Sequence, residues 1–239
     1  MEHLPNTSEA TQEALLGKPT SPLKVSLTTA AMLLLFTTIF TGLMAAAYLN
    51  TRAPIAASAE AEKLQRVTEI LPTSDFDNAP LQDAITLPAS PLLGTKTPTP
   101  LYRARKGGQP AAVIFEAVAP DGYSGNIRLL LAVRANGELA GVRVVEHRET
   151  PGLGDYIDPR KDKNKTSPWI RQFDQHSLST LPNERWTVKK DGGEFAYYTG
   201  ATISARAVSK ATGRAVEFAT KNMAQLFAAQ TGSTAQQDE

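Results

Sequence analysis

The 239-residue sequence contains no cysteine, which excludes disulfides, thiolate catalysis, and metal or iron–sulfur sites ligated by cysteine. It also lacks a charge imbalance: with 25 Lys and Arg residues and 24 Asp and Glu residues, the formal net charge is +1. Nucleic-acid binding requires a basic face or stripe, so this composition gives no support for a nucleic-acid partner. The sequence has no internal repeat, heptad array, P-loop or zinc-ligand spacing. We therefore predict neither a metal site nor a catalytic residue.

A long apolar run is present near the N-terminus. Residues 1–24 are polar and predicted to form a disordered tail, whereas residues 25–51 contain no charged side chain. The most apolar part, residues 30–49, would span ~30 Å as a helix, the thickness of a bilayer's hydrocarbon core. The alternative is a cleaved signal peptide, but the run is long for one and begins late. We predict a single transmembrane helix over residues 25–51.

The charges beside this run indicate its orientation. Lys18 and Lys24 precede it, whereas Arg52 is the one close cation after it. Cytoplasmic flanks are enriched in Lys and Arg. The pattern predicts a cytoplasmic N-terminus, contact with membrane lipid, and an exported C-terminal domain.

Residues 52–100 are predicted to be a linker helix followed by an extended segment. Residues 58–71 place Leu64, Val67, Ile70 and Leu71 on one stripe, and Pro72 ends the pattern. The next stretch is rich in proline, with a short strand expected near residues 101–104.

A domain of the α+β class is predicted over residues 101–229. The β-branched runs at 111–118, 125–133 and 139–146 predict an antiparallel meander, with Asn136-Gly137 marking a hairpin. Residues 185–189 resemble a further strand. Apolar spacings of three and four predict a helix over 204–229 that packs on the sheet, followed by a polar tail at 230–239.

The most informative stretch is Thr199-Gly200-Ala201-Thr202, between two tyrosines and the predicted C-terminal helix. Glycine permits a close ligand approach, and Thr202 lies where an N-cap residue is expected. Free N–H groups at the start of a helix favour a phosphate or another anion. Tyr197 and Tyr198 are available to pack against a flat ring. An ordinary capped helix after a glycine turn would give the same local pattern.

A second glycine-rich stretch follows the third strand, and reads Glu149-Thr150-Pro151-Gly152-Leu153-Gly154. By itself it predicts an exposed turn whose backbone can approach a ligand. His147 has a side chain suited to acid–base chemistry, but the sequence supplies no partner for it. We therefore interpret His147 as a polar loop residue.

Together the two stretches resemble a known family, the membrane-anchored FMN-binding domains. These are found in the G subunit of Rnf electron-transport complexes and the C subunit of sodium-pumping NADH:quinone reductases. The resemblance rests on the Ser/Thr-Gly-Ala-Thr motif at 199–202 and the Glu-Thr-Pro-Gly-Leu-Gly segment at 149–154, about fifty residues apart. Where the family usually has aspartate, three residues before Thr199, this chain has Ala196. The similarity is closer to the Rnf G subunit than to the quinone-reductase C subunit.

The resemblance implies one covalently bound FMN per chain, joined through its phosphate to the Thr202 hydroxyl. Other cofactor contacts implied or inferred around it are Thr199, Gly200, Ala201, Ser204, Glu149, Thr150, Gly152, Leu153 and Tyr198. The implied function is electron transfer within a bacterial inner-membrane complex that couples it to ion translocation. The implied partners are the other subunits of that complex and a flavin transferase. The alternatives are a non-redox exported binding or assembly module, or the equivalent quinone-reductase C subunit.

Between these motifs lies a charged segment, residues 155–167, that is longer than expected in the family. Its alternating signs predict a solvated loop. The segment after it, residues 168–173, resembles a family helix in which Trp169 and Phe173 form a core pair.

Overall fold

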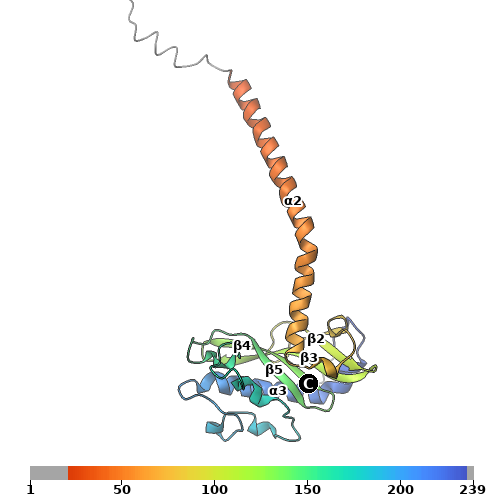
Figure 1. The fold of residues 1–239 in the computed structure, drawn as a ribbon, viewed down its shortest axis with the longest axis vertical. Helices are drawn as coiled ribbons and strands as arrows, with labels where there is room; N and C mark the ends of the chain where they lie inside the picture. Colours follow the sequence, from red (N-terminus) through yellow and green to blue (C-terminus); the bar gives the residue numbers. More distant parts are fainter. Residues whose placement is uncertain (1–20, 236–239) are drawn as a thin grey trace, which may run out of the picture. The chain divides into compact units, whose positions relative to one another are not determined.

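The computed structural model describes residues 21–235, except for the side chain of Ala56 (Figure 1). The chain divides into two compact units, Met1–Glu60 and Ala61–Glu239. Most of the predicted tail at 1–24 and the last residues of the predicted tail at 230–239 lie outside the described residues. The second unit begins well before the predicted domain boundary at residue 101, because residues 61–100 supply a strand and core side chains.

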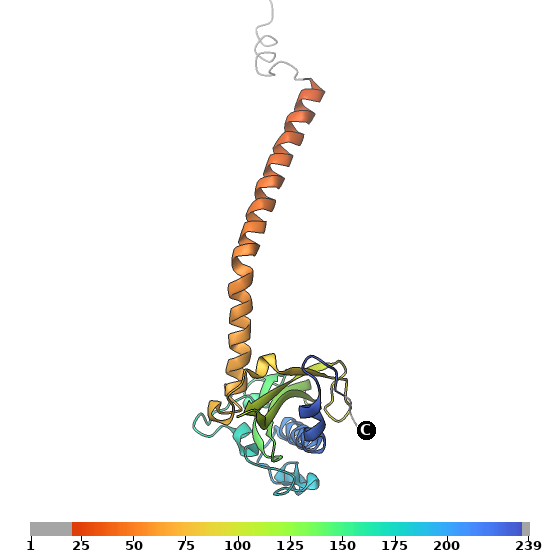
Figure 2. The same cartoon turned by 90° about the vertical axis from the view of Figure 1, so that its right-hand side faces the viewer.

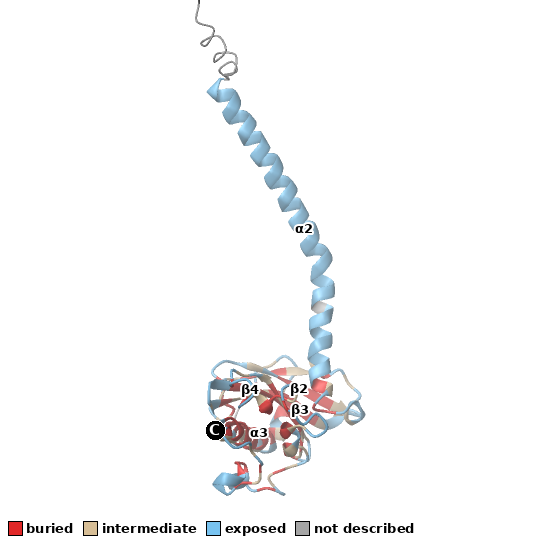
Figure 3. Ribbon diagram, turned by 60° about the vertical axis from the view of Figure 1, so that its left-hand side comes forward, coloured by how far each residue is buried: buried red, intermediate tan, exposed pale blue. Residues whose placement is uncertain are grey.

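Helix α2 covers Pro22–Thr68, a single helix of 47 residues with Pro54 inside it. The transmembrane and linker helices predicted separately are thus one helix, since residues 45–62 are rich in alanine and other strong helix formers. An apolar window of mean hydropathy 2.0 within it is entirely exposed, as Figure 3 shows along most of α2. By length and composition, α2 can cross a membrane.

Threonine hydroxyls in the apolar part of α2 form hydrogen bonds to backbone carbonyls of the same helix. Thr37 Oγ1 donates to the Leu33 carbonyl at 2.7 Å, and Thr38 Oγ1 donates to the Leu34 carbonyl at 2.8 Å. A polar group surrounded by hydrocarbon needs such a partner. These residues are therefore compatible with a lipid-facing surface.

The second unit contains one antiparallel sheet of five strands in the order β1-β2-β3-β4-β5. The strands are β1 (Ala84–Leu87), β2 (Thr99–Lys106), β3 (Gln109–Gly122), β4 (Gly125–Arg134) and β5 (Leu139–Glu146). The three predicted meander strands and the short strand near 101–104 are confirmed. Gly137 adopts a φ of +83° in the predicted turn between β4 and β5. Strand β1 escaped prediction because it has only four residues beside Pro88.

Each face of the sheet has its own core. Along β3, Val113 and Phe115 belong to the cluster on the α3 side, whereas Ala112 and Ile114 belong to the other cluster. This alternation follows from the two-residue period of a strand. The second cluster also contains Val67, Ile70 and Leu71 from the end of α2 and the turn after it; Leu64, predicted on the same stripe, is 40% exposed.

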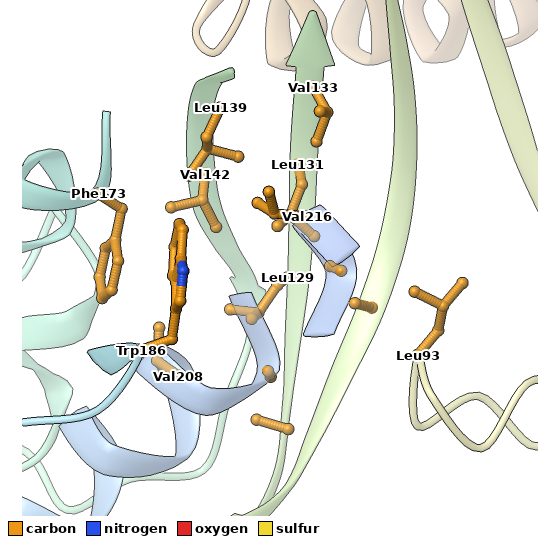
Figure 4. Packing of buried hydrophobic residues seen from close by; sticks show 14 of the residues in the cluster. Leu93, Leu129, Leu131, Val133, Leu139, Val142, Phe173, Trp186, Val208 and Val216 are labelled. Atoms are coloured by element: carbon orange, nitrogen blue, oxygen red, sulfur yellow. The ribbon is translucent and has the colours of Figure 1, made fainter. Parts of the chain in front are cut away.

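Helix α3 covers Thr202–Ala228 and lies across one face of the sheet (Figure 2). The buried face of α3 carries small side chains, so the helix backbone approaches β3 and β4 closely. Ala205, Ala211, Ala215 and Ala219 on this face are at most 2% exposed. Figure 4 shows Trp186 inserted among Val142, Phe173 and Val208 in this core. The predicted helix over 204–229 is confirmed, starting two residues earlier.

The connections contain short 3-10 helices instead of further strands. They are Thr73–Asp75, Pro80–Gln82, Asp155–Ile157, Trp169–Phe173, Asn183–Arg185 and Lys189–Asp191. The predicted strand at 185–189 is wrong, because Val188 makes just an isolated bridge to Phe195. Trp169 and Phe173 are buried with ring centroids 5.2 Å apart, which confirms their core role.

Candidate functional site

The N-terminus of α3 has no side-chain cap. Ala201 occupies the N-cap position with φ −128° and ψ 38°, and Thr202 is the first helical residue. The prediction that Thr202 caps the helix is therefore wrong by one position. The first turn contains no acidic residue. The first N–H groups of an α-helix have no intrahelical partner, so this end of a 27-residue helix is suited to an anion.

The Thr202 side chain is half-buried at this end, and within residues 21–235 its hydroxyl makes no hydrogen bond. The turn before it depends on Gly200, whose φ of +89° is unfavourable for other residues. Within the turn, the Ala201 N–H donates to the Tyr198 carbonyl at 3.0 Å. The turn therefore presents a free hydroxyl beside free N–H groups.

The loop after β5 brings a buried carboxylate to the same place. Glu149 is 4% exposed and accepts hydrogen bonds from the Ser124 N–H at 3.0 Å and from the Ser204 hydroxyl. It thereby joins the turn between β3 and β4, its own loop and the first turn of α3. None of the described Lys, Arg or His side chains forms an ion pair with it.

Two glycines make room for this carboxylate. A Cβ on Gly154 would lie 2.8 Å from Ser204 Oγ and 2.9 Å from Glu149 Oε2. A Cβ on Gly122 would lie 2.2 Å from the Gly125 carbonyl oxygen and 3.0 Å from Glu149 Oε1. Both positions thus require the absence of a side chain.

These segments enclose a pocket of about 120 Å³. Three of its lining side chains are large, apolar and well exposed: Tyr123 (66%), Leu153 (47%) and Ile203 (43%). The full lining is Tyr123, Glu149, Thr150, Leu153, Gly154, Gly200, Ala201, Ile203 and Ser204. The pocket therefore has a polar wall at Glu149 and an uncovered apolar rim.

Most of the predicted site residues meet here. Glu149, Thr150, Leu153, Gly200, Ala201 and Ser204 line the pocket, whereas Thr199, Thr202, Tyr198 and Gly152 belong to the two flanking turns and do not line it. Sequence reasoning missed Tyr123, Gly154 and Ile203. Tyr123 lies between two predicted strands, in a connection to which the sequence analysis gives no role, although an aromatic residue in a turn is a usable signal.

Residues 155–167 are only partly the solvated loop that was predicted. Tyr156, Asp158 and Asp162 are 4%, 2% and 0% exposed. Asp162 accepts hydrogen bonds from the Trp169 N–H, the Asn164 N–H and the Tyr198 hydroxyl. Burial, followed by Asp162, raises the pKa of Tyr198.

Tyr156 ties the same segment to the start of α3. Its hydroxyl donates to the Ala201 carbonyl at 3.1 Å and accepts from the Tyr198 N–H at 3.3 Å. Its ring lies 4.2 Å from that of Tyr198. Burial raises the pKa of Tyr156 to about 12, so it remains a neutral donor at physiological pH.

The structure supplies partners for His147, contrary to the sequence interpretation. Its Nδ1 accepts from the Glu149 N–H at 3.1 Å, and its Nε2 lies 4.0 Å from Asp158. These contacts orient the start of the Glu149 loop. His147 is not among the residues that line the pocket.

At Ala196 the backbone provides the contacts. Its carbonyl accepts from Trp169 Nε1 at 2.6 Å, and its N–H donates to Gln172 Oε1 at 2.7 Å. Its side chain is exposed. A side chain at this position is therefore free to vary without breaking these contacts.

Comparisons with known proteins assign the segment that contains this pocket to a family. Residues 122–217 match the FMN-binding domain family model, and this range contains every residue that lines the pocket. The chain is 44% identical to the G subunit of the ion-translocating oxidoreductase complex of Pseudomonas aeruginosa, over 83% of this chain and 91% of that protein. It is 42% identical to the Shewanella baltica protein of the same name, over 82% and 90%, and 40% identical to that of Vibrio cholerae, over 82% and 90%. The chain belongs to the family of G subunits of ion-translocating oxidoreductase complexes.

Proposed function

We propose that this protein is a membrane-anchored electron carrier that holds one FMN, esterified through its phosphate to Thr202 Oγ1. The observation that carries the proposal is the unpartnered Thr202 hydroxyl at the uncapped start of a long helix, beside a pocket with an uncovered apolar rim. The segment that supplies all of these features is the one that matches the FMN-binding domain model.

The phosphate end of the cofactor suits the turn at 199–202. Free N–H groups and the helix dipole favour a negative group there, and no acidic residue lies in the first turn. Thr199 and Gly200 are exposed, so the hydroxyl of Thr202 is reachable by a flavin transferase. None of the described side chains accepts a hydrogen bond from that hydroxyl, which is consistent with attachment by a separate enzyme.

The ring end suits the apolar rim. Pockets that enclose a whole ligand usually measure about 300–1,000 Å³, so a pocket of about 120 Å³ holds only part of one. Tyr123, Leu153 and Ile203 are available to pack against the remainder. A flavin packed on this exposed rim would remain accessible to a partner protein, as electron exchange requires.

Glu149 gives the site its electrostatic character. Ser124 and Ser204 fix the orientation of its carboxylate, and no described cation is paired with it. A buried negative charge makes additional negative charge in the pocket less favourable. Bound FMN would supply the redox chemistry, and these residues would attach it, orient it and adjust its potential.

The wider role follows from the relatives, which are named as subunits of ion-translocating oxidoreductase complexes. We propose that this chain passes electrons between other subunits of such a complex and contributes to its translocase activity. Helix α2 would anchor it as a single-pass protein of the bacterial inner membrane. The cations Lys18 and Lys24 favour a cytoplasmic N-terminus and an exported domain.

In-gel fluorescence distinguishes the carrier from an exported binding or assembly module without a redox role. The full chain is expressed with and without a flavin transferase, denatured, and illuminated in the gel. We expect a fluorescent band that requires the transferase and is abolished by Thr202→Val. Thr97→Val is the matched control, since it removes the same group from an exposed threonine outside both motifs and should leave the band. A non-fluorescent wild-type band in cells with active transferase would contradict the carrier.

A further inference from the structure

In the charged segment at 155–167, the aspartates bond to groups within the protein, whereas the basic residues are exposed. Its three aspartates accept hydrogen bonds from within the protein: Asp155 from the Gly152 N–H, Asp158 from Arg160, and Asp162 from Trp169 and Tyr198. Asp158 and Asp162 are also buried. A sequence with nearly balanced charge therefore presents a surface of one sign.

The four cations of this segment are exposed, and one of them, Arg160, is paired with Asp158. Arg160, Lys161, Lys163 and Lys165 are all exposed, and we call residues 160–165 the basic loop. The Lys165 ammonium donates to the Arg160 carbonyl at 2.7 Å, which closes the loop on itself. Within residues 21–235, the Lys161 and Lys163 side chains make no hydrogen bond or ion pair. Two unneutralised ammonium groups thus stand on a loop whose shape is fixed from inside.

The basic loop is joined to the start of α3. Asp162, within the loop, accepts from the Tyr198 hydroxyl at 3.2 Å, and Tyr198 lies four residues before Thr202. Tyr156, just before the loop, donates to the Ala201 carbonyl. A protein that contacts the basic loop is therefore held beside the turn that bears Thr202.

We propose that the basic loop is the electrostatic docking surface for an acidic redox partner protein. This inference rests on the proposed function, because the docking surface has a purpose only beside a redox group. Lysine ammonium groups on an exposed loop attract an acidic surface at long range without demanding one fixed geometry. Such contacts raise the association rate more than the affinity, which suits a domain that exchanges electrons with more than one partner in turn.

The test uses the full chain in an uncharged detergent, flavinylated by co-expressed transferase and then chemically reduced. Stopped-flow absorbance follows transfer of one electron at a time from the flavin to the ferric haem of two probes, the acidic haem domain of cytochrome b5 and the basic cytochrome c. Lys161→Glu/Lys163→Glu is the test variant. Lys106→Glu/Lys221→Glu changes the net charge equally on exposed residues, one at the end of β2 and one near the far end of α3. Because it also removes the Lys106 bond to the Ser74 carbonyl and the Lys221–Glu217 pair, denaturant unfolding must first show that both variants are folded.

With cytochrome b5 we expect the wild-type rate constant to fall as ionic strength rises from about 10 mM to about 500 mM. At the lower ionic strength the test variant should be slower by about tenfold, and the matched control by about twofold or less. With cytochrome c the test variant should be the faster protein. Equal rates for the test variant and the matched control, in protein that carries reducible flavin, would overturn the docking surface.

A second measurement separates this inference from the proposed function. Binding of the Thr202→Val chain to immobilised cytochrome b5 requires no flavin, and Lys161→Glu/Lys163→Glu should weaken it about tenfold at low salt. If flavin is absent from wild-type protein but this difference remains, the proposed function fails and the acidic partner stands. If the same lysines instead govern sedimentation with phosphatidylglycerol vesicles and leave cytochrome b5 binding unchanged, the occupant is a membrane surface and the inference is overturned.

Discussion

The two ends of α3 are built in opposite ways. At the C-terminal end, the buried Arg103 donates to the carbonyls of Leu226 and Ala229, and it also binds Asp83 and Thr231. At the N-terminal end, no side chain caps the helix and the Thr202 hydroxyl has no described partner. We call the C-terminal end, which Arg103 caps, the closed end of α3, and the uncapped N-terminal end the open end. The closed end fixes the helix on the sheet, so the polar groups at the open end can remain available to a ligand. Under the proposed function, stability and cofactor attachment thus depend on different ends of one helix.

The largest expected effect comes from breaking the closed end. Arg103→Met leaves the last carbonyls of α3 without their donor and Asp83 without one of its two cations. Removing one partner of a buried ion pair typically costs about 3–5 kcal/mol. Denaturant unfolding of the purified chain measures this cost, and a loss below about 1 kcal/mol would contradict a stabilising role for Arg103.

The folded fraction of Arg103→Met should still accept flavin, because Thr202 lies at the other end of the helix. Thr231→Val is the milder control, since it removes the hydroxyl that donates to Asp83 and accepts from Arg103 but leaves the Arg103–Asp83 ion pair in place. It should cost about 1 kcal/mol.

The second effect is an opposite response of the two ends to pH. Burial raises the pKa of Asp83, but hydrogen bonds from Arg105, Thr231 and Arg103 outweigh it and lower the pKa below 3.8. A lowered carboxyl pKa contributes stability above the unfolded value, which is lost as pH falls through the folded value. The closed end should therefore loosen in acid, below about pH 4.

Tyr156 gives the open end the reverse behaviour. Its pKa is raised from 10.0 to about 12, so its contribution is complete below pH 10 and is lost between pH 10 and 12. Amide hydrogen exchange of α3 in acid and in alkali would locate each loss, and Tyr156→Phe should remove the alkaline step at residues 198–202. Full protection of residues 226–229 in acid, or an alkaline step at 198–202 that Tyr156→Phe leaves unchanged, would contradict the assignment.

The third effect is a strained turn at the open end. Gly200 has a φ of +89°, and a Cβ there would meet only Leu153 Cδ1, at 3.8 Å. Gly200→Ala is therefore a change of backbone preference, with little steric clash, and should cost about 1–2 kcal/mol. Because the strain falls on the turn that bears Thr202, the rate of flavin transfer should fall more than in a variant with a similar loss of unfolding free energy elsewhere in the domain. Gly107→Ala is a matched control, with φ +57° in a turn far from the site. Equal slowing of transfer by both variants would contradict a specific role for Gly200.

The smallest effect concerns Ala196. Its side chain is exposed and its contacts are made by the backbone, so Ala196→Asp should change the free energy of unfolding by about 0.5 kcal/mol or less. The variant restores the residue that is usual in the family, and we expect a faster initial rate of flavin transfer in a time course of in-gel fluorescence. An unchanged rate would show that the transferase does not recognise a carboxylate at this position.

The comparison of the two ends also separates what the sequence predicts from what it does not. The open end was recognisable because its signals are local: a glycine turn, a threonine and a helical pattern within ten residues. The closed end was not, because Arg103 and Ala229 meet across 126 positions of sequence. The same reason explains residues 155–167. Asp162 is buried and accepts hydrogen bonds from Trp169 and Tyr198, and a local charge pattern does not predict these contacts.

Strand predictions follow the same rule. The runs in β3, β4 and β5 carry enough β-branched residues to be recognised without context, and the turn at Asn136-Gly137 fixes the register of β4 and β5. At 185–189, the Thr187 N–H bonds to the Arg185 carbonyl and the Lys189 N–H to the Phe195 carbonyl, so local turn hydrogen bonds replace a strand ladder. The exact start of α3 depends on one backbone conformation, that of Ala201, and propensity does not resolve a single residue.

Peptide mapping by mass spectrometry of the full wild-type chain, purified from cells that contain an active flavin transferase, tests the central claim most directly. We predict that the peptide containing residues 199–206 carries the mass of FMN less one water, and that fragmentation places it on Thr202. An unmodified Thr202 in that peptide, or FMN on Ser204 or Thr199 instead, would contradict the assignment of the open end of α3 as the attachment site.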